Sequence, residues 1–279
     1  MASGGSRAGP DYIAKTGSEG RARLKIQHRV FAPGTEMLLK MSAFRPDMRV
    51  LVIGSGCGDE TIMIASLMDD DGRLVAVDKS IEQIEQARQA VKEASLEKKV
   101  TFINKTIEEL TADDGQYDLI LGRFVIPHLA EPKEAIIKLT ALLKPGAVLA
   151  SQEPIVSSCY SDPRSPALEK YLRLMLDFAK ANLLDFDMAK TIPTMFASCG
   201  LVTDEQLWQP KVLGPDKSMV TMSAQECMPA ILKYGLISLT ESEQLIADIE
   251  KEVVNPEDAV LFQCKNVLTV GRKPDLAPR

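Results

Sequence analysis

The stretch "VLVIGSGCGDE", residues 50–60, decides the fold. Four apolar residues are followed by three glycines at alternate positions and then by an acid: Gly54, Gly56, Gly58 and Asp59. A buried strand that ends in a tight turn and opens a helix has this pattern, and such a turn lets the backbone approach a ligand closely. The stretch therefore predicts a strand over 50–53, a helix over 59–68 and a ligand site between them.

The spacing of the glycines disfavours the usual phosphate-binding motifs. The dinucleotide motif G-x-G-x-x-G would place its last glycine at position 59, where this chain has Asp59. A carboxylate in the first turn of that helix would repel a pyrophosphate group. The Walker motif also fails, because no Gly-Lys-Ser/Thr follows. The turn therefore favours a ligand without phosphate.

A second acid stands at the end of the next predicted strand, "RLVAVD", residues 73–78. Asp78 follows Gly58 by twenty residues, which is the spacing at which an acid accepts the ribose hydroxyls in nucleotide-binding sheets. A ribose without phosphate suits S-adenosylmethionine, whose positive sulfonium and ammonium groups tolerate nearby carboxylates. The two features together favour this cofactor.

Strands and helices alternate along the first half of the chain. Strands are predicted over 50–53, 73–78, 99–104, 117–122 and 147–153, with helices over 59–68, 80–95 and 131–143. This alternation is typical of an α/β fold with a doubly wound, Rossmann-like parallel sheet. The segment 19–43 precedes the sheet and predicts two short helices, broken near Pro33-Gly34.

The alternation changes after Glu153. Helices are predicted over 168–184 and 188–199, which indicates a helical insert over about 156–200 after the fifth strand. Further helices are predicted over 224–234 and 241–253. The segments 201–214 and 261–273 are predicted to add a sixth and a seventh strand, giving a seven-stranded sheet.

Composition narrows the class of protein. The chain has 279 residues, of which 45% are hydrophobic and 26% are charged, as in ordinary globular proteins. Its net charge of −6 disfavours a nucleic-acid partner. Five cysteines without a C-x-x-C pair and only two histidines predict neither a disulfide framework nor a metal site. With no signal-peptide or membrane-spanning pattern, we expect a cytoplasmic protein without a membrane partner, and its oligomeric state stays open.

Several motifs occur together in the order and spacing of one enzyme family: "VLVIGSGCGDE", "VAVDKS", "YDLILGRFVIPHL", "LLKPGAVLASQEP" and "VLTVGRK". They are preceded by a helix that carries Tyr12, Glu19, Arg23, Leu24 and Gln27. The sequence resembles class I S-adenosylmethionine-dependent methyltransferases, most closely small-molecule methyltransferase-domain proteins. The resemblance covers most of 12–154 and returns in the last strand. It implies a flexible segment 1–18 and a single methyltransferase domain over 19–279, in which the helical insert forms a lid.

The resemblance also implies the residues that bind the cofactor. The glycine turn lines the methionine part, Asp78 binds the ribose, and Gly122 and Arg123 face the sulfonium side. Thr106 and Ile107 meet the adenine edge. The full implied set is Tyr12, Arg23, Gln27, Gly54, Ser55, Gly56, Asp59, Asp78, Lys79, Thr106, Ile107, Gly122 and Arg123.

The chain departs from the family at two positions of this site. The family usually has an acid where Val52 stands, and that acid helps to hold the amino end of the cofactor. It also usually has an acid where Thr106 stands, next to the adenine amino group. Both changes would weaken cofactor binding. Asp59 and Gln27 are the candidates to replace the first acid.

Two residues are candidates for catalysis on the acceptor side. His128 lies in "FVIPHLAEP", just after the fourth strand, and histidine suits a general base near neutral pH. It has an alternative role in capping or packing beside Pro127. Glu153 ends the fifth strand, where it would orient an acceptor or cap the following turn. Ligands bind outside the carboxyl ends of parallel strands, so we expect both residues to approach one pocket.

These observations predict methyl transfer from S-adenosylmethionine to a small organic acceptor by in-line displacement. The sulfonium is already a good leaving group, so the protein mainly has to align the reactants and exclude water. A non-catalytic module that binds S-adenosylmethionine or S-adenosylhomocysteine is an alternative that Val52 and Thr106 keep open. A protein methyltransferase is a further alternative, disfavoured by the acidic net charge.

Overall fold

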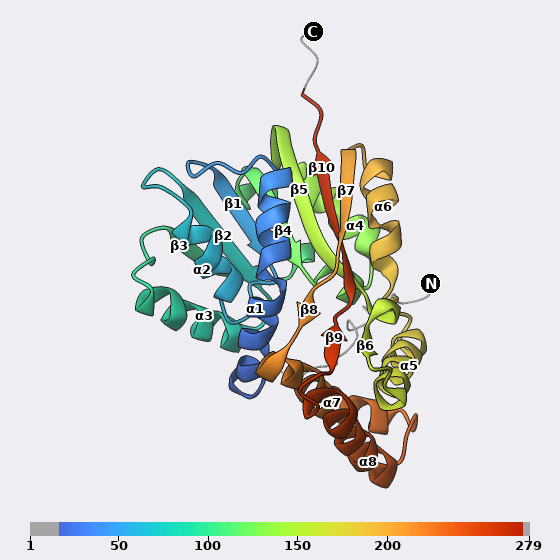
Figure 1. Ribbon diagram of the computed structural model, residues 1–279. Coiled ribbons are helices and arrows are strands. Elements are labelled where there is room, and N and C mark those ends of the chain that lie inside the picture. The colour runs from blue at the N-terminus through green and yellow to red at the C-terminus, as the bar shows by residue number, and fades with distance from the viewer. Residues whose placement is uncertain (1–16, 276–279) are drawn as a thin grey trace, which may run out of the picture.

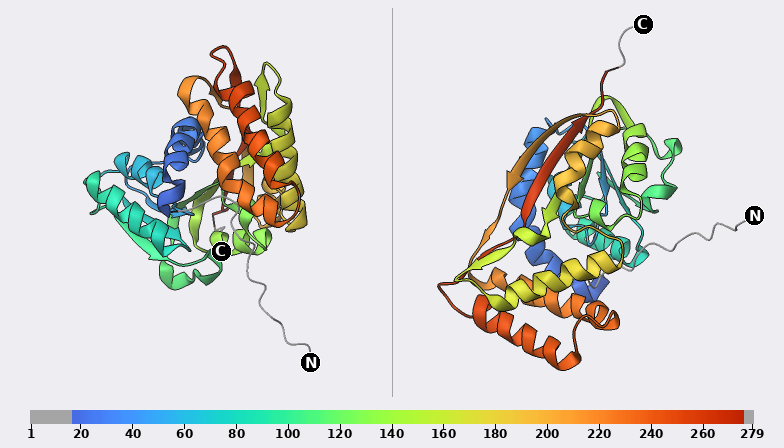
Figure 2. Two further views of the ribbon diagram at one scale, coloured as in Figure 1. Left: turned by 90° about the horizontal axis from the view of Figure 1, so that it is seen from below. Right: turned by 90° about the vertical axis from the view of Figure 1, so that its right-hand side faces the viewer.

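A seven-stranded sheet with helices on both faces forms the body of the protein, in a computed structural model that describes residues 17–275 (Figures 1 and 2). The strand order is β3-β2-β1-β4-β5-β10-β7. All neighbours pair in parallel except β10, which is antiparallel to both β5 and β7. The predicted α/β class, the doubly wound arrangement and the seven strands are confirmed. The strands are β1 Arg49–Ile53, β2 Arg73–Asp78, β3 Val100–Asn104, β4 Tyr117–Arg123, β5 Leu143–Ile155, β7 Val202–Trp208 and β10 Lys265–Arg272.

Two helical layers enclose this sheet. Helices α1, α2 and α3 share one hydrophobic core with one face of the sheet, and α4 and α6 share another with the opposite face. The helices are α1 Gly17–Met41, α2 Asp59–Ser66, α3 Ile81–Glu93, α4 Pro132–Ala141, α5 Pro166–Ala181, α6 Ile192–Ser198, α7 Ser218–Lys233 and α8 Leu239–Ile249. The helix expected over 188–199 is a 3-10 turn, Met188–Thr191, that continues into α6, and α6 packs on the sheet.

The segment 19–43 does not form two helices. It lies in the single helix α1, with Pro33 exposed inside it, so the predicted break is wrong. Proline in a helix interior costs about 3 kcal/mol, because it removes a backbone hydrogen bond. Contacts with the sheet oppose that cost: the Thr35 hydroxyl donates to Gln152 Oε1 at 2.7 Å, and Gln152 Nε2 donates to the Phe31 carbonyl at 3.2 Å.

The two late strands are each divided between two sheets, which the sequence did not predict. The segment 201–214 gives β7 and then β8, Lys211–Val212, while 261–273 falls in β9, Val260–Phe262, and β10. With β6, Tyr160–Asp162, the short strands form a second sheet in the order β6-β9-β8. Pro210, which has no N–H to donate, stands where the chain passes from β7 to β8.

Helices α5, α7 and α8 pack together beyond the carboxyl ends of the parallel strands, at the lower end of Figure 1. We call these three helices, together with the small sheet, the cap. The cap has its own hydrophobic core, which includes Leu168, Phe178, Cys227, Ile231 and Ile249. Residues Val30 and Phe31 of α1 belong to the same core, so α1 joins the cap to the sheet.

The packing of α1 predicts opposite effects for two adjacent substitutions. A Cβ atom at Gly34 would stand 2.6 Å from the Trp208 ring and 2.8 Å from Gln152 Nε2. Gly34→Ala should therefore lower the free energy of unfolding by about 1–3 kcal/mol. Pro33→Ala should raise it, because a helical N–H is restored.

Chemical denaturation of the two variants beside the wild type measures both effects. Glycine-to-alanine changes inside helices ordinarily stabilise by roughly 0.5–1 kcal/mol. A stabilised Gly34→Ala variant would therefore show that α1 does not press on the sheet at this point.

Candidate functional site

The glycine turn lies at the carboxyl end of β1 in a conformation that requires glycine. The φ angles of Gly54, Gly56 and Gly58 are +66°, +51° and +93°, in the left-handed region. A Cβ atom at Gly54 would stand 2.6 Å from the Val125 side chain, and one at Gly58 would stand 3.0 Å from Ala87. The turn is therefore packed between the segment after β4 and helix α3. Ser55, buried in the turn, donates its N–H to the Val77 carbonyl at 3.0 Å.

The Asp78 carboxylate ties the turn to the end of β2. Oδ2 accepts the Gly56 N–H at 3.0 Å, and Oδ1 accepts the Ser80 N–H at 2.9 Å. Burial raises the pKa of Asp78, and these two hydrogen bonds oppose the shift. Lys79 is exposed beside it, and Asn104 Nδ2 donates to the carbonyls of Asp78 and Lys79 at 3.0 Å each. The ends of β1, β2 and β3 are thus joined at one edge.

Four other positions that the sequence analysis singled out lie near this edge. Thr106 caps the 3-10 turn Ile107–Glu109, its N–H donating to Glu109 Oε2 at 2.7 Å, and Ile107 is buried beneath it. Val52 lies between Ala76 and Leu121 in the sheet and is fully buried, so the strand is apolar where the family carries an acid. Asp59 is partly exposed at the first position of α2.

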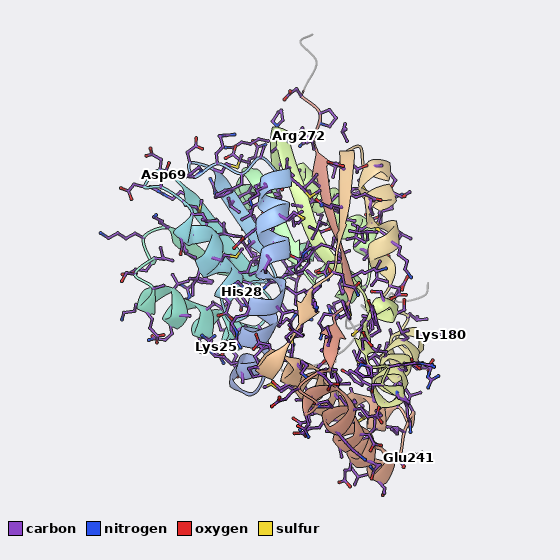
Figure 3. All side chains as sticks on the ribbon, in the orientation of Figure 1. Lys25, His28, Asp69, Lys180, Glu241 and Arg272 are labelled. Carbon is purple, nitrogen blue, oxygen red and sulfur yellow. The ribbon has the colours of Figure 1, made fainter. Side chains whose placement is uncertain are left out.

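Gly122 and Arg123 end β4 beside the turn. A Cβ atom at Gly122 would stand 2.6 Å from the Ile53 side chain. Arg123 is buried against α1, where its guanidinium donates to Thr35 Oγ1 at 3.1 Å and contacts His28 Nδ1 at 3.3 Å; Figure 3 labels His28 on that helix. Arg123 Nε also lies 4.0 Å from Glu60 Oε1.

Glu60, which the sequence did not single out, is a buried acid in the first turn of α2. Only 5% of the residue is exposed, and burial raises the pKa of its carboxyl, opposed by the charge of Arg123. An acid directly after a glycine turn resembles the ordinary acidic first turn of a helix. The sequence therefore gave little indication that Glu60 is a buried acid next to the glycine turn.

Glu153 is fully buried in β5, and its carboxyl holds the segment that follows β4. Oε1 accepts the N–H groups of Val125 and Ile126, both at 3.1 Å, whereas Oε2 has no hydrogen-bond partner among residues 17–275. Burial raises the pKa of Glu153 to about 8. At neutral pH this carboxyl is therefore mostly protonated.

His128 follows in the same segment, in the 3-10 turn Ile126–His128. Its ring packs edge-on against Phe186, with 5.5 Å between ring centroids. Desolvation lowers the pKa of His128 to about 4, so the imidazole is neutral at neutral pH. Because Glu153 holds Val125 and Ile126, it also sets the position of His128.

A cavity of about 180 Å³ lies next to His128, between the sheet edge and the cap. Its wall is mostly apolar and includes Phe31, Phe124, His128, Tyr171, Met219 and Cys264. Glu153 is not part of the wall, although its neighbour Pro154 is. Of the two predicted catalytic residues, His128 alone reaches the cavity.

The predicted α1 residues also lie at this cavity. Arg23 and Gln27 line it, and Arg23 Nη1 donates to Gln27 Oε1 at 2.5 Å. The α1 residue that contacts the glycine turn is instead Arg21, whose Nη1 donates to the Cys57 carbonyl at 3.2 Å. Tyr12 lies outside the described residues.

Two searches over residues 17–275 complete the description of the site. No group of three or more His, Cys, Asp or Glu side chains is arranged there to hold a metal ion. Within the same range, no helix is both long enough and apolar enough to cross a membrane.

Comparisons with known proteins agree with this geometry. A family model described as "Methyltransferase domain" matches residues 44–199. Among curated relatives, the ubiquinone/menaquinone biosynthesis C-methyltransferase UbiE of Vibrio campbellii is 26% identical over 158 residues. That alignment covers 54% of this chain and 59% of the relative, so the chain spans less than two thirds of the relative's length.

Solved structures share the fold at low sequence identity. The YcgJ protein of Bacillus subtilis gives a TM-score of 0.57 at 18% identity, covering 86% of this chain and 98% of that protein. A methyltransferase-like protein of Bacillus halodurans, BH2331, gives 0.58 at 14% identity over the same shares of the two chains. The family model spans more than half of the sequence and includes both the glycine turn and the Asp78 edge. The chain therefore belongs to the methyltransferase-domain family of class I S-adenosylmethionine-dependent methyltransferase enzymes.

Proposed function

We propose that the protein transfers the methyl group of S-adenosylmethionine to a small organic acceptor bound in the cavity. One observation carries this proposal. Val125 packs against Gly54 of the glycine turn, while its neighbour Phe124 and the nearby His128 line the cavity. A single short segment therefore forms one side of the cofactor turn and one wall of the cavity, as a transfer between two adjacent ligands requires.

The residues at the sheet edge fit the adenosyl cofactor. Each oxygen of the Asp78 carboxylate accepts one backbone N–H, which leaves acceptor capacity for the ribose hydroxyls. Gly56 has no side chain over the turn, so a ligand can approach the backbone closely. When bound, the cofactor supplies an activated methyl group. The residues proposed to hold it are those predicted from the sequence other than Arg23 and Gln27, which line the cavity, with the glycine turn and Asp78 at the centre.

The missing acid at Val52 has a candidate replacement in Glu60. This carboxyl is buried in the first turn of α2, and its Oε1 makes no hydrogen bond within the described part of the chain. Its partner at 4.0 Å, Arg123, is held by Thr35 and His28. Glu60 supports a role at the amino end of the cofactor better than Asp59, which is partly exposed.

On the acceptor side, the protein's own groups position the acceptor and accept a proton. The imidazole of His128 is neutral at the cavity wall and can accept a hydrogen bond from an acceptor hydroxyl. Its pKa of about 4 makes it a weak base, so it would take the proton only as the methyl group arrives and the hydroxyl oxygen becomes strongly acidic. Glu153 is mostly protonated at neutral pH and does not line the cavity, so it suits a positioning role through Val125 and Ile126. The apolar wall excludes water from the transfer.

The relatives support a small molecule as the acceptor. UbiE is named for methylation in ubiquinone and menaquinone biosynthesis, and the present chain shares only part of that protein's length. A mostly apolar cavity of about 180 Å³ beside a cap suits a small ligand better than a protein side chain on an extended substrate. A module that only binds the cofactor would show the same binding without turnover, and an activity assay separates the two cases.

Replacing His128 should slow the transfer much more than it weakens cofactor binding. Loss of a general base costs about 10²–10⁴-fold in rate. The assay first screens small hydroxyl-bearing acceptors for a mass gain of one methylene unit, and then measures single-turnover rates and cofactor affinity for His128→Ala and His128→Gln. Both variants should be slow, because glutamine can form hydrogen bonds but is not basic. Wild-type rates in both would leave alignment alone as the catalytic contribution.

Glu153→Gln should change how stability depends on pH. In the wild type the folded pKa of about 8 lies above the ordinary value of 4.5, so the folded state keeps a proton that the unfolded chain loses. The free energy of unfolding therefore falls as pH rises through this window. His128 has the opposite sign, because its pKa is lowered from 6.5 to about 4, but it acts only below about 6.5.

Glu60, whose pKa burial also raises, is present in both proteins, so the difference between them from about pH 6.5 to 8 reports on Glu153. Melting temperatures of wild type and Glu153→Gln in matched buffers should diverge across this range, in favour of the variant at the higher pH. Parallel curves would show that Glu153 is already ionised in the folded protein.

A further inference from the structure

A buried ion pair adjoins the acceptor cavity. Arg23 Nε of α1 donates to Glu226 Oε2 of α7 at 2.6 Å, and the two side chains are only 7% and 8% exposed. Arg23 lines the cavity together with Gln27, which accepts its second hydrogen bond. The pair therefore places a guanidinium at an otherwise mostly apolar wall, with its counter-charge on the cap.

Stability alone does not explain this pair. Desolvating two charges costs several kcal/mol, and a well-packed apolar pair in the same place is often as stable or more so. What the pair does fix is the charge that a ligand meets. The carboxylate of Glu226 opposes the charge of Arg23, so the guanidinium attracts an anion much less strongly than an unpaired one would.

Four other ionisable groups of the wall are also uncharged at neutral pH. His128 is neutral because desolvation lowers its pKa to about 4. Burial raises the pKa of Tyr171 well above its ordinary value, and the pKa of Cys227 is raised in the same way. The pKa of Cys159 is raised well above its ordinary value, first by its hydrogen bond with Cys264 and then by burial. A ligand in this cavity therefore meets a wall with no net charge.

One polar pair in the wall points to the oxygen of a ligand. The Tyr171 hydroxyl and the Ser223 hydroxyl lie 3.0 Å apart, and both residues line the cavity. Two hydroxyls that share one hydrogen bond use one of their two protons. The Cys227 sulfur, which also hydrogen-bonds with Tyr171 and Ser223, is only a weak acceptor for the other, so a stronger acceptor can still take it. A hydroxyl or carbonyl oxygen of a ligand meets that requirement.

We infer that the cavity selects an uncharged, largely apolar acceptor that carries a hydroxyl or carbonyl oxygen, and that Glu226 sets this selectivity by neutralising Arg23. The inference rests on the proposed function, because it takes the cavity as the acceptor site. An anionic acceptor would have to leave water for a site where the one cation among the described lining residues, Arg23, is already paired. The pair thus acts as a filter against carboxylates.

Calorimetric titration of the full chain with 1-naphthol and 1-naphthoate at neutral pH tests the inference, since the two probes have similar ring systems and differ in charge. Wild type should bind 1-naphthol at least roughly tenfold more tightly. Glu226→Gln removes the counter-charge and should raise the affinity for 1-naphthoate by roughly tenfold or more, with little change for 1-naphthol. Adding Arg23→Met to Glu226→Gln should return the wild-type preference.

The matched control is Asp216→Asn, which breaks the exposed pair between Arg29 of α1 and Asp216, 2.6 Å apart, and should leave both affinities unchanged. Equal affinity of wild type for the two probes, or no gain of 1-naphthoate affinity in Glu226→Gln, would overturn the inference and leave the proposed function intact. Failure of both probes to bind any form would overturn the cavity as the acceptor site. If Glu226→Gln does not fold, the comparison of the two probes on the wild type decides, because equal affinity for both would overturn the inference.

Discussion

The hydrogen bonds of the Asp78 carboxylate fix the edge of the sheet on which the site depends. One oxygen holds Gly56 in the left-handed conformation and the other holds the N–H of Ser80, whose hydroxyl then caps α3. The carboxylate thereby joins the strand end, the glycine turn and a helix start in one arrangement. Burial raises the pKa of Asp78, because desolvation disfavours the ionised carboxylate. Two hydroxyls of a bound ribose would donate hydrogen bonds to the carboxylate and stabilise its charge.

The proposed acceptor side is built from the same edge by a second buried carboxyl. Glu153 holds Val125 and Ile126, which places Val125 against Gly54 and brings His128 to the cavity. Helix α1 closes the arrangement, because it packs on Gln152 through Thr35 and reaches Glu226 of the cap through Arg23. The cofactor turn, the cavity wall and the cap are therefore connected through a few buried polar contacts, and α1 takes part in most of them.

The sequence predicted the five parallel strands, the glycine turn and a helix that begins near Ser80, because local periodicity and turn chemistry determine these features. It failed where distant contacts override local preference. Pro33 suggested a break, but the sheet holds α1 together, and the segments 201–214 and 261–273 each serve two sheets that only the tertiary structure distinguishes. The buried ion-pair positions of Glu60 and Glu226 could not be recognised either, since their partners, Arg123 and Arg23, are 63 and 203 residues away in the sequence.

We expect this edge of the sheet to bind an adenosyl ligand that carries no phosphate. Equilibrium titration of the full chain with S-adenosylmethionine, S-adenosylhomocysteine, NAD and ATP tests it most directly, with Asp78→Ala as the paired variant. Both adenosyl ligands should bind more tightly than NAD or ATP, and Asp78→Ala should weaken the binding of both adenosyl ligands by roughly tenfold or more. Tighter binding of NAD, or adenosyl binding that is unaffected by the loss of Asp78, would contradict it.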